Sequence, residues 1–480
     1  MARLREVTTA TVVGSGPNGL AAAVTLAAAG LDVTVLEAAD TPGGGVRSVE
    51  ATLPGLLHDE CSGFHPLAVG SELARTFDLA AHGLQWAWPE AQYAHPLDGG
   101  DGAVAVRSVA ATAAGLGTDG RSWERLFGPL TRRFDAVTDD LLRPVLHVPR
   151  HPVDLVGFGA RAGLPATLLG RRFGTEPARA LWAGVAAHAF RPLDTLASSA
   201  IGLALGTAAH HAGWPVAVGG SRAIADAYLS LLARLGGRVE TGVRVTSYAE
   251  CAADVVLLDT SPRAAVDILG DRMPARVRSA YLRHRHGPGA FQLALAVEGG
   301  VPWAYEPARR AGTVHVGGTA AEVADAERRT WRGRLADRPF VLVGQQHVAD
   351  PSRSRGDLHP VDAYAHVPAG YDGDATELLL DQLERFAPGF RERVVAVTRR
   401  SPRDLESGNA NLVGGDVVGG ANTARQLLLR PRVALDPYAT GVEGVYLCSA
   451  STPPGAGAHG LCGLRAAESA LRSLERGPTG

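Results

Sequence analysis

The sequence predicts an α/β protein in which a parallel-sheet domain, assembled from separate stretches of the chain, is interleaved with a second, α+β domain. Two observations predict this fold class. The first forty residues read as strand, tight turn, helix and strand, and the last forty repeat the order of strand, turn and helix. The length of 480 residues agrees with two domains, because a single hydrophobic core rarely serves so long a chain.

The N-terminal pattern starts with a β-branched run over residues 9–13 that leads into a glycine-rich turn over 14–19. Residues 20–29 are rich in Ala and Leu and predict a helix, and residues 33–36 predict a second strand. This order is a complete β-α-β unit of the kind that binds a dinucleotide.

Four residues of this unit are predicted to bind the dinucleotide. Gly14 permits the tight turn, Gly16 lets the backbone approach the pyrophosphate, and Gly19 allows close packing of the helix. Glu37, at the end of the second strand, is placed to accept hydrogen bonds from the adenosine ribose. The strand context and the acid make this pattern more specific than the glycine spacing alone.

A second glycine-rich loop follows the acid directly and contains Gly43, Gly44 and Arg47. Such a loop can wrap the pyrophosphate from its other side, with the arginine giving a forked, charge-assisted bond. The stretch from residue 14 to 47 resembles the flavoprotein superfamily that contains carotenoid (phytoene) desaturases and flavin amine oxidases. The resemblance implies that the cofactor is FAD. Many members have an arginine directly after the glycine pair, where this chain has Gly45.

The C-terminal pattern has an apolar strand over 442–447, a loop rich in Gly and Pro, and a helix over 461–474. This stretch is similar to the closing motif of carotenoid desaturases, and specifically to the branch of pyridine nucleotide-disulfide oxidoreductase domain 2 proteins. In that family the loop borders the isoalloxazine and ribityl chain, which implies flavin contacts for Ser449, Ala450 and Gly457. The positive end of the helix would stabilise a reduced flavin.

The middle of the chain supplies the third part of the predicted FAD-binding domain. Residues 221–235 predict a helix, and the following strand matches a family strand that supplies backbone groups to the adenine ring, with Val245 at that position. The resemblance implies a Rossmann-like domain of the glutathione reductase type, in the amine oxidase and phytoene desaturase group. Its predicted segments are 8–75, 211–290 and 406–480, and those of the substrate domain are 76–210 and 291–405.

The function implied by the resemblance is that of an FAD-dependent desaturase or dehydrogenase. It would remove a hydride from a C–C or C–N bond of an apolar small molecule, in secondary or isoprenoid metabolism. Two alternatives stay open: a flavin amine oxidase, and an isomerase that uses FAD without net redox change. All 47 basic residues in the Lys and Arg total are arginines, so lysine Schiff-base chemistry is excluded. The absence of lysine also disfavours the amine oxidase, since many of those enzymes place a lysine near the flavin.

Two histidines are candidate catalytic bases. His459 stands in the loop nearest the expected flavin, and His65 follows the first phosphate loop. Both can titrate near neutrality, although most of the 16 histidines are expected to be solvated or satisfied in the core. Trp214 and Tyr438 are candidates to border the substrate, with packing between domains as the alternative. The apolar stretch 192–209 is expected to be a helix, either lining a cavity or lying in the core.

Composition limits the remaining partners. A formal net charge of -2 without a basic cluster disfavours nucleic acid. The four cysteines are far apart and none has a zinc-site spacing, so no metal site is expected. No uninterrupted apolar window is long enough to span a membrane, and the protein is expected to be cytoplasmic. Peripheral contact with a membrane, to collect an apolar substrate, and the oligomeric state stay open.

Overall fold

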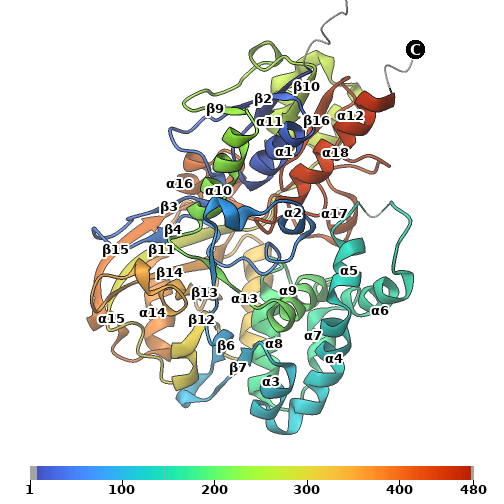
Figure 1. Ribbon diagram of the computed structural model, residues 1–480. Helices are drawn as coiled ribbons and strands as arrows, with labels where there is room; N and C mark the ends of the chain where they lie inside the picture. Colours follow the sequence, from blue (N-terminus) through green and yellow to red (C-terminus); the bar gives the residue numbers. More distant parts are fainter. Residues whose placement is uncertain (1–7, 145, 477–480) are drawn as a thin grey trace, which may run out of the picture.

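The computed structural model describes residues 8–144 and 146–476 and contains two large sheets, shown in Figure 1. The first sheet is parallel, with five strands in the order β16-β10-β1-β2-β9. The predicted strands at both ends of the chain are confirmed, although the last one starts three residues later than expected. The strands are β1 (Thr9–Val13), β2 (Asp32–Leu36), β9 (Arg238–Glu240), β10 (Val255–Leu258) and β16 (Val445–Leu447).

Helices cover both faces of the parallel sheet, because its strands carry apolar side chains on both sides. Val12 and Leu257 face one helical layer, whereas Val13 and Leu258 face the other, as the twofold repeat of a strand requires. The first layer contains α1 (Pro17–Ala28), α10 (Arg222–Arg234) and α18 (Leu461–Arg476), and the second contains α11 (Pro262–Leu269) and α12 (Ala275–Leu282).

The two ends of the described chain meet in this sheet. Strand β10 lies between β1 and β16, with Val12 paired to Leu257 and Val256 paired to Val445. Helix α18 crosses α1 so closely that a Cβ on Gly463 would lie 1.8 Å from the main-chain oxygen of Asn18. The predicted Rossmann-like α/β fold is confirmed.

The second sheet has seven strands in the order β15-β11-β14-β13-β12-β6-β7. Its neighbours are antiparallel except for β12 and β6, which run parallel. The strands are β6 (Ala91–Pro96), β7 (Gly102–Val106), β11 (Gly289–Glu298), β12 (Ala311–Val316), β13 (Val341–Gly344), β14 (Leu358–Val367) and β15 (Val394–Arg400).

One face of the seven-stranded sheet packs on α14 (Thr376–Phe386). The other face packs on a helical group that lies beside it in Figure 1 and includes α4, α8 and α9. The helices of this group are α3 (Val109–Gly115), α4 (Gly120–Arg132), α5 (Phe134–Leu141), α6 (Pro152–Ala162), α7 (Ala166–Gly170), α8 (Glu176–Ala187) and α9 (Ser199–His211). The helix expected over 192–209 begins later, at Ser199. The chain before it forms turns rather than helix, and Ala197 there has a φ of 63°.

Short elements connect these layers. The remaining helices are α2 (Glu72–Thr76), α13 (Ala320–Trp331), α15 (Phe390–Arg393), α16 (Pro402–Gly408) and α17 (Ala424–Leu429). The remaining strands are β3 (Ser48–Val49), β4 (His58–Asp59), β5 (Trp86–Ala87) and β8 (Val216–Ala217).

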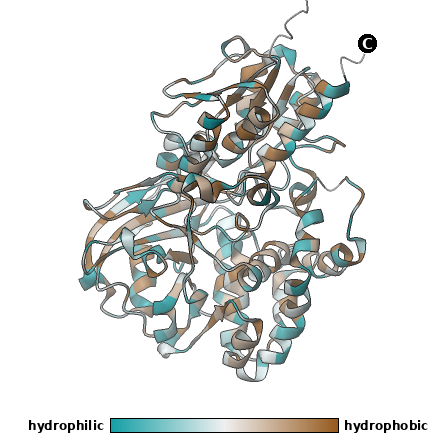
Figure 2. Ribbon diagram, in the orientation of Figure 1, coloured by the Kyte–Doolittle hydropathy of each residue, from teal (hydrophilic) through white to brown (hydrophobic). Residues whose placement is uncertain are grey.

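In Figure 2, brown apolar residues gather in the region of the parallel sheet and the helices packed on it, while teal hydrophilic residues are spread over helices and loops of the whole molecule. Within residues 8–144 and 146–476, no helix combines the length and the apolar character needed to cross a membrane.

Candidate active site

A long cleft of about 560 Å³ runs along the carboxyl edge of the parallel sheet; we call it the dinucleotide cleft. Ligands of parallel α/β sheets bind at this edge, where turns and helix N-termini meet. Loops near both ends of the described chain, residues 14–18 and 449–458, contribute to the lining of the cleft. Of the predicted cofactor residues, it exposes Gly14, Gly16, Glu37, Gly44, Arg47, Val245, Ser449, Ala450 and Gly457.

The two glycine-rich loops touch each other beside the cleft. A Cβ on Gly44 would lie 2.9 Å from the Cα of Gly16, and Gly43 donates its N–H to the main-chain oxygen of Ser15 at 3.1 Å. Gly19 lies beneath the turn, where a Cβ would be 2.0 Å from the oxygen of Gly14. Gly19 and Gly43 therefore shape the loop from behind rather than lining the cleft.

Glu37 accepts several hydrogen bonds at the end of the cleft where the adenosine is predicted to bind. Its Oε2 accepts the N–H of Ser15 at 2.8 Å and the hydroxyl of the same residue at 2.6 Å, and its Oε1 accepts the N–H of Ala39 at 2.8 Å. A carboxylate offers about four acceptor positions, so about one is left for a ribose hydroxyl.

Asp259 is a residue of this site that the sequence analysis missed. It follows β10 directly, is buried, and its Oδ2 accepts the N–H of Gly19 at 2.9 Å. The pKa of Asp259 is raised to about 7, mainly by burial and also by the nearby charge of Glu37, against the lowering by the Gly19 hydrogen bond. An acid at the end of an apolar strand, as with Glu37, is the signal that predicts such a position.

Arg47 lines the cleft, but its guanidinium already has partners. Its Nε pairs with Glu60 at 2.8 Å, and its Nη2 donates to the main-chain oxygen of Gly408 at 2.7 Å. The pyrophosphate role of Arg47 therefore stays a prediction.

Val245 lies in an irregular segment and not in the strand expected there. Strand β9 ends at Glu240, Gly242 turns the chain with a φ of 72°, and Val243 then donates its N–H to the oxygen of Glu37 at 2.8 Å. That hydrogen bond brings the segment to the adenosine end, where Val245 lines the cleft.

A second cavity of about 340 Å³ lies between the seven-stranded sheet and α9; we call it the apolar cavity. Helix α9 contributes Ile201, Ala204 and Leu205 to its wall, so this helix both lines a cavity and packs into the core. Trp214 lines the cavity as expected. Tyr438 does not line it: its side chain is buried and donates a hydrogen bond from its hydroxyl to the oxygen of Pro453 at 3.0 Å.

The dinucleotide cleft and the apolar cavity share five lining residues, which we call the junction: Cys61, Ser62, Val417, Ala456 and Gly457. The junction is formed by three segments: residues 61 and 62, which follow the second glycine-rich loop, residue 417, and residues 456 and 457 of the loop before α18. A ligand that fills the cleft from Glu37 to Gly457 therefore reaches the edge of the apolar cavity.

His65 is buried beside the junction but does not belong to the described lining of either cavity. Its Nε2 lies 2.9 Å from the Oγ of Ser221, which donates to the main-chain oxygen of Ser62 at 2.6 Å, so Nε2 is the donor to Ser221. Burial lowers the pKa of His65 to about 4.

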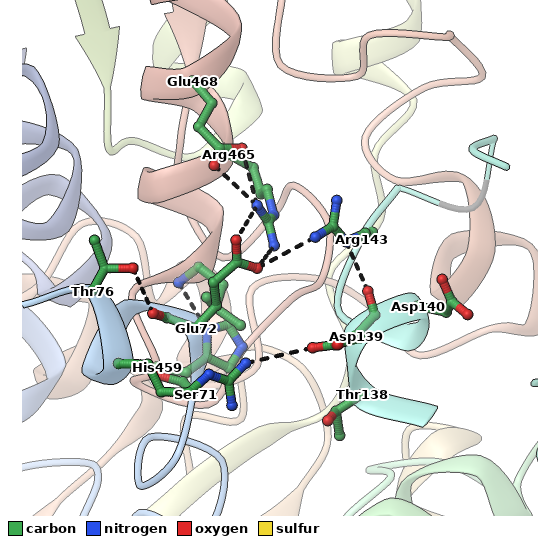
Figure 3. A network of polar contacts seen from close by, with 12 residues as sticks. Ser71, Glu72, Thr76, Thr138, Asp139, Asp140, Arg143, His459, Arg465 and Glu468 are labelled. Atoms are coloured by element: carbon green, nitrogen blue, oxygen red, sulfur yellow. Dashed lines mark hydrogen bonds and ion pairs between the residues drawn. The ribbon is translucent and has the colours of Figure 1, made fainter. Parts of the chain in front are cut away.

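His459 lies directly behind the junction, because a Cβ on Gly457 would be 2.8 Å from its ring. Its Nδ1 accepts the N–H of Leu461 at 3.1 Å, which satisfies the start of α18, and burial lowers its pKa to about 4. Figure 3 draws His459 with the polar network in which Arg465 pairs with Glu72. A catalytic role for His459 or His65 stays a prediction, and their contacts indicate a structural role.

Two titratable side chains on the wall of the apolar cavity, Tyr364 and His188, are held in their neutral forms. Burial raises the pKa of Tyr364, and it lowers the pKa of His188 to about 3. Phe190 has a φ of 51° and stacks on Tyr364 with ring centroids 6.2 Å apart. Neither Tyr364 nor His188 adds a charge to this part of the wall.

The residues of the cleft fit a dinucleotide better than a metal. The described residues contain no cluster of three or more His, Cys, Asp or Glu side chains that could hold a metal ion. The glycines where the two loops touch leave the main chain exposed to a pyrophosphate, and the N-terminus of α1 faces the same place.

A parallel sheet with a cleft at its carboxyl edge, joined to an apolar cavity under a second sheet, defines a Rossmann-like, dinucleotide-binding type of fold. The NAD(P)-binding Rossmann-like domain family matches residues 12–82. The mouse pyridine nucleotide-disulfide oxidoreductase domain-containing protein 2 is 37% identical over 98 residues, which are 20% of this chain and 17% of that protein. Hydroxyneurosporene desaturase of Rhodobacter capsulatus is 56% identical over 46 residues, which are 10% of this chain and 9% of that enzyme.

Solved structures share the fold over almost the whole chain. Putrescine oxidase bound to putrescine is 15% identical with a TM-score of 0.62, covering 98% of this chain and 99% of that one. A fatty acid isomerase from P. acnes that produces CLA is 15% identical with a TM-score of 0.56, covering 97% and 98%.

The predicted resemblance to carotenoid desaturases and to pyridine nucleotide-disulfide oxidoreductase domain 2 proteins is confirmed. The matched stretches span less than a fifth of the length of these two curated relatives. The sequence likeness is therefore local, while the likeness in fold is global.

Proposed function

We propose that this protein is an FAD-dependent oxidoreductase that removes a hydride from a carbon of an apolar small molecule, as a desaturase or dehydrogenase. The junction carries the proposal, because it is the place where the dinucleotide cleft opens into the apolar cavity. FAD, when bound, supplies a ring that accepts a hydride. The global likeness in fold to an oxidase and the local likeness to a desaturase support this class.

The chain's own residues bind, orient and keep water away. Glu37 would hold the ribose, and the backbone near Gly16 and Gly44 would hold the pyrophosphate. The N-terminus of α18, after the loop that contains Gly457, would stabilise negative charge at the far end of the cofactor. The apolar walls of the second cavity would exclude water from the reacting bond.

We also propose the predicted division of the chain into an FAD-binding and a substrate domain. All five strands of the parallel sheet fall inside segments 8–75, 211–290 and 406–480, and the seven-stranded sheet falls inside the other segments except for the first two residues of β11. A cytoplasmic enzyme that meets its apolar substrate in solution or by peripheral contact with a membrane fits this architecture.

The test is to release and identify the bound cofactor, and then to mix the yellow protein anaerobically with candidate apolar substrates. Loss of the yellow absorbance together with an oxidised product is the expected result. Product without loss of absorbance would favour an isomerase, and oxidation of amines alone would favour an amine oxidase. A denatured protein that releases no FAD, and that binds none when it is added, would contradict the proposal.

A further inference from the structure

The wall of the apolar cavity carries a guanidinium group that no carboxylate contacts within the described residues. Arg430 lines the cavity and is 3% exposed. Its Nε donates to the oxygen of Gln426 at 3.0 Å, its Nη2 to Oδ1 of Asn422 at 2.9 Å, and its Nη1 to the oxygen of Ala450 at 3.4 Å. All three acceptors are neutral, and in the part of the chain that the structure describes no Asp or Glu forms an ion pair with Arg430.

A second buried guanidinium meets the same asparagine. Arg191 is 6% exposed, and its Nη1 donates to the main-chain oxygen of Asn422 at 2.6 Å. Its Nη2 donates to Oγ1 of Thr195 at 2.7 Å, while its Nε is buried without a partner. The neutral Asn422, itself 5% exposed and part of the cavity wall, therefore lies between two positive charges.

The other charged side chains on the cavity wall each contact a possible partner of opposite charge, unlike Arg430. Arg400 lies 3.5 Å from Glu60, which also pairs with Arg47 at 2.8 Å, His58 contacts Asp362 at 2.7 Å, and Asp59 pairs with Arg353 at 2.6 Å. The nearby carboxylate of Asp416 is engaged elsewhere: it accepts the N–H groups of Gly287 at 3.0 Å and Val418 at 2.9 Å and pairs with His286.

A buried charge without a partner of opposite charge is strongly unfavourable, and proteins tolerate it where a ligand supplies the opposite charge. A guanidinium has five N–H donors, and Arg430 uses three of them on protein oxygens. Gly455, which lines the same cavity, keeps the Nη1 edge accessible, because a Cβ there would lie 2.9 Å from Nη1.

We propose that Arg430 binds the carboxylate of the substrate, so that the substrate class is an apolar carboxylic acid. The apolar body of the acid fills the cavity toward the junction, and Asn422 and Arg191 hold the guanidinium in place and add positive potential. This inference rests on the proposed function and names its substrate class. It also disfavours amines, since an ammonium group would meet two uncompensated guanidinium groups.

The experiment measures binding of decanoic acid, methyl decanoate and decylamine to the FAD-loaded protein by calorimetry. We expect the acid to bind at least about ten times more tightly than the ester, because a hydrogen bond between two charged groups is stronger than one to a neutral ester oxygen. We expect the amine to bind most weakly. Equal affinity for acid and ester in the unmodified protein overturns the proposal without any variant.

The variant Arg430→Gln is expected to lose about tenfold or more in affinity for decanoic acid, with the ester changed less than about threefold. The matched control is Arg425→Gln, which removes the same charge from an exposed position of α17. An equal loss for acid and ester in Arg430→Gln overturns the proposal, and so does loss of FAD from that variant, which would assign Arg430 to the cofactor. FAD content is read from the absorbance spectrum, so failure of the proposed function is distinguishable from failure of the carboxylate site.

Discussion

The dinucleotide cleft and the apolar cavity are built in different ways. The cleft is made by main chain, by glycines and by acids that follow strands β2 and β10. The cavity is made by side chains from α9, from the seven-stranded sheet and from loops at both ends of the chain. A site made of main chain depends on space and backbone geometry, whereas a site made of side chains depends on packing.

Because of this difference, the two sites are sensitive to different kinds of substitution. A single Cβ blocks the cleft, since the glycines around Gly16 leave less than 3 Å for it. The cavity has apolar walls that tolerate exchange of one apolar residue for another of similar volume, whereas Arg430 on the same wall makes side-chain hydrogen bonds to neutral acceptors that another residue type would not reproduce.

The largest expected effect comes from Gly16→Val. The added side chain would start 2.8 Å from Oδ2 of Asp259 and would fill the approach of the pyrophosphate, so we expect FAD affinity to fall by more than about 100-fold. Fluorescence titration with FAD measures it. The control is Gly115→Ala, at the end of α3, where a Cβ meets nothing within 4 Å. Stoichiometric FAD in Gly16→Val would show that the cleft is not the cofactor site.

The next effect concerns Asp259, whose raised pKa makes the folded state bind a proton more tightly than the unfolded state does. The contribution of Asp259 to stability is therefore complete at acidic pH and is lost as the pH rises from about 4 through about 7. The substitution Asp259→Asn keeps a side-chain oxygen that can accept the N–H of Gly19. Because asparagine does not ionise, the variant does not lose this stability as the pH rises.

We expect Asp259→Asn to gain about 2–3 kcal/mol in unfolding free energy relative to the wild type between pH 5 and pH 8. Urea unfolding at the two pH values checks this. A difference between variant and wild type that does not change with pH would show that Asp259 is ionised in both states.

A smaller effect is expected from Glu37→Gln, which keeps the size of the side chain but removes its charge. The glutamine loses one acceptor oxygen, so the Ser15 and Ala39 contacts compete with the ribose, and FAD affinity should fall roughly tenfold. Titration at low and high salt measures the change. The prediction fails if Glu37→Gln binds FAD as tightly as the wild type does.

The smallest effect is expected from the two histidines. His65→Gln and His459→Gln should change the rate of flavin reduction by substrate less than about threefold, because neither ring lines a cavity within the described residues. Stopped-flow mixing measures the rate. A decrease of 100-fold or more in either variant would restore that histidine as the catalytic base.

The sequence predicted the parts of this protein that are local in the chain. The β-α-β unit and the predicted roles of Gly16 and Glu37 follow from residues close together in the chain, and the structure places both residues around one cleft. The predicted start of α9 was seven residues too early, because an apolar run by itself does not show where turns of the chain precede the helix. Val245 was expected on a strand that ends earlier, since Gly242 turns the chain toward Glu37.

By itself, the sequence determined the parallel sheet, its two glycine-rich loops and the dinucleotide-binding pattern, because glycine spacing and strand-end acids act over a few neighbouring residues. Only the tertiary structure decided which side chains face the apolar cavity. In the folded chain, His459 lies behind the junction, and Arg430 lies beside Asn422 on the wall of the apolar cavity. The physical reason is that burial and the pairing of charges depend on elements that meet from distant parts of the chain, which no local pattern records.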